Sequence, residues 1–135
     1  MIHLCYKSYE WKVTEGACKS FFDKTGLDLY TVFGDYISTS LKVQGENAIG
    51  MMQAYSKLYT RDVASKALHA IISSINDEVK LNEIEDATFR VGWYLSDRPD
   101  ELSEPWPFVM LKAAYEINDY NNANIPKKKA ATSAG

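Results

Sequence analysis

The chain has 135 residues, of which 46% are hydrophobic and 24% are charged. This balance argues against a disordered chain, and the length predicts one domain that needs no disulfide or metal to fold. The formal net charge of −3 is unevenly distributed. Residues 1–125 carry 12 basic and 18 acidic side chains and so −6, whereas residues 126–135 carry three lysines and no acid. Because an acidic body matches a phosphate backbone poorly, we expect no nucleic-acid partner.

The apolar runs are too short for a membrane protein. A bilayer span needs about 20 apolar residues, and the run at residues 108–111 has only four. The opening MIHLCYKSYEWK also lacks the order of a signal peptide. We therefore expect no membrane partner and a cytoplasmic location, in which Cys5 and Cys18 stay reduced.

The N-terminal residues alternate between apolar and polar. Ile2, Leu4 and Tyr6 predict a short strand, and the alternation continues to Val13, which indicates a hairpin or a bent strand. Thr14 resembles the N-cap of a first helix, because its hydroxyl can accept a hydrogen bond from a free N–H of the first turn.

The next two helices are predicted from apolar spacing. Gly26 is a natural end for the first helix, since glycine adopts the left-handed conformation easily. A helix over residues 27–41 follows, with Asp28 near its start and one apolar face: Leu29, Val32, Phe33, Tyr36 and Ile37. Gly34 lies inside this helix and suggests a close helix crossing.

Two further helices occupy the middle of the chain. Residues 46–59 place Ile49, Met52 and Tyr55 on one face. Thr60 or Asp62 is expected to cap the clearest helix of the sequence, whose apolar stripe comprises Val63, Ala64, Ala67, Leu68, Ile71, Ile72 and Ile75.

The last elements complete a mainly α fold. Residues 83–95 have helical spacing, residues 96–100 read as a loop, and Pro107 fits the first turn of a helix that runs to about residue 120. We predict a compact single domain of about six helices with a short N-terminal β segment over residues 1–125. Residues 126–135 are expected to form a flexible Lys-containing tail.

No motif in the sequence predicts an enzyme, a cofactor or a metal. The motifs of nucleotide binding, serine hydrolysis and zinc proteolysis are absent. His3, Cys5, Cys18 and His69 form only one tight ligand pair instead of the two typical of zinc sites. Nine acids between residues 76 and 104 favour a solvated surface. A docking face for a basic partner is one alternative. A catalytic or calcium site is another, and the calcium interpretation lacks the loop that binds this ion.

The aromatic residues offer a candidate protein-interaction patch. Trp93, Tyr94, Trp106 and Phe108 flank the acidic loop at residues 96–104. One interpretation is that these side chains belong to the core and to partly covered surface. The other is that they form an interface with a partner, because Trp and Tyr anchor many interfaces. If they form an interface, replacing Trp93 and Trp106 with alanine should weaken partner binding while the helical circular dichroism is unchanged.

At the level of overall pattern, the sequence resembles a known family. It has a helix ending in FFDKTGLDL (residues 21–29), compact helices, an SDRPDE loop, a final helix and a Lys-containing tail. This pattern is similar to the small tail assembly chaperones of long-tailed, non-contractile, lambda-like bacteriophages. The resemblance implies a non-enzymatic protein of the host cytoplasm that binds the tape measure protein, recruits tail tube subunits, self-associates and is absent from the mature virion.

The resemblance also suggests a role for the codons of the tail. Many such chaperones are made in two lengths, the longer through a programmed ribosomal frameshift near the end of the short reading frame. Lys127, Lys128 and Lys129 have A-rich codons, so the codons of this tail are a candidate slippery stretch.

Three other classes stay open at this stage. One is another small phage structural or interaction protein, such as a head–tail connector or a stoichiometric inhibitor. Another is an enzyme or metal protein. The last is a helix-turn-helix regulator built on residues 60–75, which the acidic body disfavours and which would offer DNA only Arg61 and Lys66.

Overall fold

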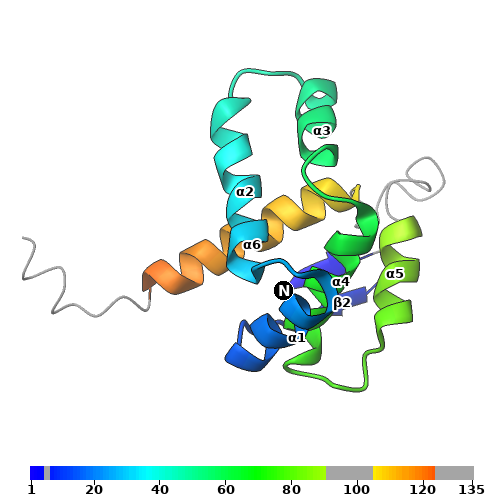
Figure 1. The fold of residues 1–135 in the computed structure, drawn as a ribbon. Coiled ribbons are helices and arrows are strands. Elements are labelled where there is room, and N and C mark those ends of the chain that lie inside the picture. The colour runs from blue at the N-terminus through cyan, green and yellow to red at the C-terminus, as the bar shows by residue number, and fades with distance from the viewer. Residues whose placement is uncertain (5–6, 91–104, 124–135) are drawn as a thin grey trace, which may run out of the picture.

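The computed structural model of the chain describes residues 1–4, 7–90 and 105–123 (Figure 1). Within these residues it has six helices and one two-stranded sheet, which confirms the predicted mainly α domain with its N-terminal β segment. In chain order the elements are β1 (Ile2–Leu4), β2 (Lys7–Tyr9), α1 (Glu15–Thr25), α2 (Leu29–Lys42), α3 (Ala48–Ser56), α4 (Arg61–Ser73), α5 (Leu81–Arg90) and α6 (Trp106–Ala123).

Helix α4 forms the centre of the core. It packs against α1, α5 and α6, and the helix side chains Leu68, Ile71 and Ile72 are almost completely buried. Most of the predicted stripe is therefore confirmed, but Ile75 is 47% exposed. The helix ends at Ser73, so the helical period no longer directs Ile75 inward. No helix in the described part of the chain is long and apolar enough to cross a membrane.

The N-terminal strands form an antiparallel hairpin in which Ile2 pairs with Tyr9. Tyr9 also ties the hairpin to α5, because its hydroxyl donates to Glu83 Oε2 at 2.5 Å and Lys7 Nζ lies 3.2 Å from the same oxygen. The second strand ends at Tyr9 rather than continuing to Val13. Beyond it, the backbone N–H of Lys12 donates to the carbonyl of Ile71 at 2.9 Å, which holds the chain against α4.

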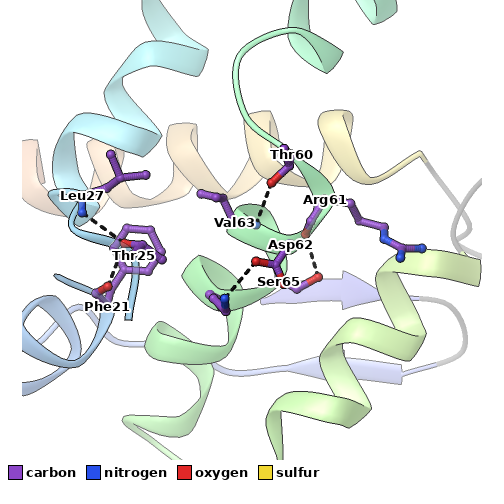
Figure 2. Close-up of polar contacts among 9 residues, drawn as sticks. Phe21, Thr25, Leu27, Thr60, Arg61, Asp62, Val63 and Ser65 are labelled. Atoms are coloured by element: carbon purple, nitrogen blue, oxygen red, sulfur yellow. Dashed lines mark hydrogen bonds and ion pairs between the residues drawn. The ribbon is translucent and has the colours of Figure 1, made fainter. Parts of the chain in front are cut away.

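The helix starts follow the predicted capping residues. Thr14 Oγ1 accepts from the N–H of Ala17 at 3.0 Å, and Thr60 Oγ1 accepts from the N–H of Val63 at 3.2 Å. Asp62, the alternative cap of α4, instead pairs with Lys66 one turn later at 2.8 Å (Figure 2). Such caps each stabilise a helix by about 1 kcal/mol.

A short junction joins α1 to α2. Gly26 adopts φ 73°, the left-handed conformation that the sequence predicted for the end of α1. The hydroxyl of Thr25 donates to the Phe21 carbonyl at 2.8 Å and accepts from the N–H of Leu27 at 3.1 Å (Figure 2). Asp28 then caps α2 by accepting from the N–H of Thr31 at 2.9 Å. Three successive contacts therefore fix the turn between the two helices.

Helices α2 and α3 differ from prediction in two respects. A Cβ at Gly34 would meet no atom within 4 Å, so the expected close helix crossing is wrong. Helix α3 is shorter than residues 46–59, because Asn47 accepts from the N–H of Gly50 and starts the helix at Ala48. Ile49 then lies in the first turn, beyond the packed part of α3, and is 70% exposed instead of sharing the face of buried Tyr55.

Helix α6 is a long helix against which several other elements pack. It begins at Trp106, with Pro107 in its first turn as expected, and ends at Ala123, slightly beyond the predicted end near residue 120. The helix packs against α2, α3, α4 and β1. Its buried side chains are Pro107, Val109, Met110, Ala113, Ala114 and Ile117.

Candidate protein-binding site

The structure describes only two of the four residues of the predicted aromatic patch. Trp106 and Phe108 are half-buried in the first turn of α6 and pack against the core. The Phe108 ring lies edge-on to Tyr55, with centroids 5.7 Å apart at 75°. Trp93, Tyr94 and the lysines at 127–129 lie outside the described residues. The described half of the patch thus holds α6 against α3.

A tyrosine cluster, which sequence reasoning missed, joins α2 to α3. The ring of Tyr36 lies 6.4 Å from Tyr55 and 6.2 Å from Tyr59, centroid to centroid. The hydroxyl of Tyr59 donates to Asp35 Oδ2 at 2.5 Å. Burial and this hydrogen bond to Asp35 raise the pKa of Tyr59 to about 12. Only the i, i+4 spacing of Tyr55 and Tyr59 hints at the cluster in the sequence.

The two inner tyrosines of the cluster serve packing rather than chemistry. Tyr36 and Tyr55 are fully buried, and their hydroxyls have no hydrogen-bond partner among the described residues. Burial raises the pKa of both phenols above the ordinary value of 10.0. Both phenols therefore stay protonated near neutral pH, and the rings contribute as large apolar groups.

The outer ends of α2 and α3 form a prong, defined here as residues 41–52. Figure 1 shows both helices rising from the body to the loop that joins them. Leu41 is 61% exposed and Ile49 is 70% exposed, the highest values among the exposed large hydrophobic side chains of the described residues. Val43, Met51 and Met52 are half-buried beside them.

The prong also carries no net charge. Between residues 36 and 56 only Lys42 and Glu46 carry charge, and their signs cancel. Polar and aromatic contacts fasten the base of the prong, where Ser40 Oγ lies 2.6 Å from the hydroxyl of Tyr115 on α6. The tip thus presents apolar side chains on a supported base, an arrangement typical of a binding surface.

Some acids of the acidic region make structural contacts, and others are exposed on the surface. The side chain of Glu83 is held by Tyr9 and by Lys7, and these hydrogen bonds lower the pKa of Glu83. Asp77 and Glu78 are exposed in the turn before α5. The acids at 97–104 lie outside the described residues, so their arrangement with the exposed acids stays a prediction.

The residues considered for zinc have other contacts. His69 Nε2 donates to the Val79 carbonyl at 2.9 Å, and His3 Nδ1 lies 2.6 Å from Ser8 Oγ. Cys18 is half-buried, and burial raises the pKa of its thiol. In the described parts of the chain, no group of three His, Cys, Asp or Glu residues is placed to hold a metal ion. Cys5 lies outside those parts.

No protein-family model matches the chain, and comparisons with curated proteins and with solved structures also return no match. What the chain binds is therefore inferred from its own surfaces. Among the surfaces described above, the prong combines exposed apolar side chains, no net charge and a base fastened to α6 by the contact between Ser40 and Tyr115.

Proposed function

We propose that the chain is a phage tail assembly chaperone, which binds the tape measure protein and helps to recruit tail tube subunits in the cytoplasm of the host cell. The exposure of Leu41 and Ile49 on a prong with no net charge carries this proposal. Apolar side chains are costly to leave in water, and a partner that covers them gains about 25 cal/mol for each Å² buried. The proposal describes a protein-binding helper that is not an enzyme.

The resemblance to tail assembly chaperones supplies the particular partners. Its most specific segment, residues 21–29, includes the junction in which Gly26 ends α1 and Asp28 starts α2. This junction sets the direction in which α2 and the prong leave the body. A well-defined helix end is a physical feature that a binding module needs, since it orients the contact surface.

The chemistry of the prong suits a helical partner. A tape measure protein is long and helical, and the apolar face of a helix is commonly recognised by an apolar surface. One such contact is weak, but several chaperone copies along one tape measure chain raise the overall affinity through multivalency. Self-association of the chaperone would arrange those copies, and symmetric assembly is the usual form.

A pull-down experiment tests the proposal directly. The double variant Leu41→Ser/Ile49→Ser removes the apolar side chains from the prong, and we expect capture of the co-expressed tape measure protein to fall at least about tenfold, since hot-spot residues dominate binding. The matched control is Phe22→Ser on α1, which removes a side chain of similar exposure, 57%, away from the prong. Equal capture by the double variant and the wild-type chain would refute the prong as the binding surface.

The aromatic residues need a modified test. Trp106 packs against the core, so Trp106→Ala is expected to lower stability as well as binding. Trp93→Ala and Trp106→Ala are therefore measured separately, with thermal unfolding beside each pull-down. A loss of capture at a temperature where the variant is fully folded would support a second contact surface around Trp106.

Two further observations separate the proposal from its alternatives. Mass spectrometry of purified virions should find no copies of the chain, whereas a head–tail connector would persist in the particle. The codons of Lys127, Lys128 and Lys129 should contain a slippery heptamer if a longer frameshifted product is made. If these codons contain no slippery heptamer, the idea of a second, longer product is refuted and the chaperone proposal is unaffected.

A further inference from the structure

A hollow lies between strand β2 and the end of helix α4. Its volume is about 170 Å³, and it is lined by residues 7–10 on one side and by Ile72 and the turn before α5 on the other. In that turn the N–H of Val79 donates to the Asn76 carbonyl at 3.2 Å. Figure 1 shows β2 and the end of α4 in the lower part of the body, away from the tip of the prong. The hollow is therefore a separate surface feature.

The apolar residues of the lining give the hollow a hydrocarbon floor. Ile72 and Val79 are buried, and Tyr9 is buried beside them. At the rim Ile75 is 47% exposed, so one apolar side chain of the lining is still largely in water. An apolar cavity of about 150 Å³ is enough to hold benzene, whereas small-molecule sites usually exceed about 300 Å³. The hollow is thus sized for one apolar side chain and not for a cofactor.

The unpaired charges around the hollow are acidic. Glu10 is exposed in the lining, and Asp77 and Glu78 are exposed at the two central positions of the turn. Within the described residues these three carboxylates form no ion pair. Lys7 also lines the hollow, but its ammonium group is already paired with Glu83 at 3.2 Å. Three carboxylates are therefore available to a cation.

The neighbouring lysine does not cancel this acidity. Lys80 follows the turn and acts on His69, since burial lowers the pKa of His69 and the charge of Lys80 lowers it further. When Lys7 and Lys80 are both counted, two ammonium groups stand against the four carboxylates named above. Residues 1–125 as a whole sum to −6. The local field therefore favours a cationic occupant.

We propose that this hollow binds a basic segment of another protein, in which one apolar side chain is flanked by lysine or arginine. The apolar side chain enters the hollow, packs over Ile72 and Val79 and is covered at the rim by Ile75. The lysine or arginine side chains beside it form charge-assisted hydrogen bonds with the three available carboxylates. This inference goes beyond the proposed function and does not depend on it, because the site does not involve the prong.

Fluorescence polarisation with the full chain tests this inference. The probe is a labelled heptapeptide with leucine at its centre, two lysines on each side of the leucine and a serine at each end. We expect it to bind, and we expect at least about tenfold weaker binding when serine replaces the leucine, because the buried apolar contact is lost. Equal binding of the two peptides would overturn the proposal, since charge alone would then account for the binding.

Charge variants of the chain test the acidic turn. Asp77→Asn/Glu78→Gln should weaken binding of the leucine probe at least about threefold, because it removes two carboxylates that face the lysines. The matched control Asp23→Asn/Asp119→Asn removes two exposed acids from α1 and α6 and should leave binding unchanged. Equal weakening by the two double variants, or no binding of the probe to the wild-type chain, would overturn the proposal.

A variant of the rim tests the apolar contact from the side of the chain. Ile75→Ser should weaken binding of the leucine probe at least about threefold. The matched control Phe22→Ser removes an exposed apolar side chain of α1 and should leave binding unchanged. Undiminished binding to Ile75→Ser, or the same loss with both variants, would overturn the proposal. A dimer of the free chain that Ile75→Ser dissociates would also overturn it, since a second copy would then occupy the hollow.

Discussion

Helix α4 and the α2–α3 prong contain similar side chains and use them in opposite ways. In α4, Leu68 and Ile71 are fully buried among neighbouring helices. On the prong, Leu41 and Ile49 are mostly exposed although they have the same chemistry. The contrast indicates that the apolar content of the described residues exceeds what the core uses, and that the two most exposed of the large hydrophobic side chains lie on the prong. Substitutions should therefore separate the two regions by stability and by binding.

The largest expected effect is in the core. Leu68→Ala should lower the free energy of unfolding by about 2–5 kcal/mol, because it removes buried apolar contacts and leaves a cavity. Leu41→Ala should change it by less than about 0.5 kcal/mol, since the side chain is already in water. Urea denaturation of both variants measures the difference. Similar losses at the two positions would show that the prong is part of the core.

An intermediate effect is expected in the tyrosine cluster, where the two regions meet. Tyr59→Phe should cost about 1–2 kcal/mol, because it removes the hydrogen bond to the Asp35 carboxylate. Tyr36→Phe should leave the free energy of unfolding unchanged or raise it by up to about 1 kcal/mol, because the buried hydroxyl has no partner among the described residues. The same denaturation assay compares them, and a larger loss for Tyr36→Phe would contradict the packing role.

The caps give a smaller effect that distinguishes global from local stability. Thr60→Ala, at the start of central α4, should lower the free energy of unfolding by about 1 kcal/mol. Asn47→Ala removes the equivalent contact on α3, but we expect faster amide exchange in the first turn of α3 with a smaller global loss. Native-state hydrogen exchange tests this, because regions with few packed contacts open locally. Matching global losses would mean that α3 unfolds together with α4.

The smallest effect concerns pH. Burial lowers the pKa of His69 below its ordinary value of 6.5, so the unfolded chain binds a proton more readily than the folded one. Stability from this residue is therefore complete above pH 6.5 and declines as the pH falls from there toward the lower folded pKa. His69→Gln should flatten this part of the pH profile of the urea midpoint. An unchanged profile would assign the acid sensitivity to other groups.

Features set by neighbours along the chain were predictable from sequence. Thr14, Gly26 and Thr60 act within a few residues of themselves, so composition and spacing identified these helix ends. The exposure of Ile49 was not predictable, because helical spacing does not say how far a helix extends beyond its packing partner. The stripe of α4 was clear because its burial repeats over three turns.

The candidate site was harder to predict than the fold. Trp106 and Phe108 were singled out as aromatic, but whether they face a partner or the core depends on α3, which lies far away in the sequence. The tyrosine cluster likewise needs tertiary contacts between residues that are distant in the sequence. Glu116, for example, meets Trp11 across 105 positions of the chain. A pattern in one sequence does not show which residues far apart in the chain come into contact.

The junction at Gly26 has a mechanical consequence. Between the last residue of α1 and the first of α2 there are only three residues, and their conformation is held by Thr25 and Asp28. With no slack there, a load applied at the tip of the prong cannot be absorbed by a loose hinge. A displacement of α2 would therefore be passed to α1 through this short connection, and also to α6, against which α2 packs. The direction of the prong is therefore coupled to the orientation of α1 and α6.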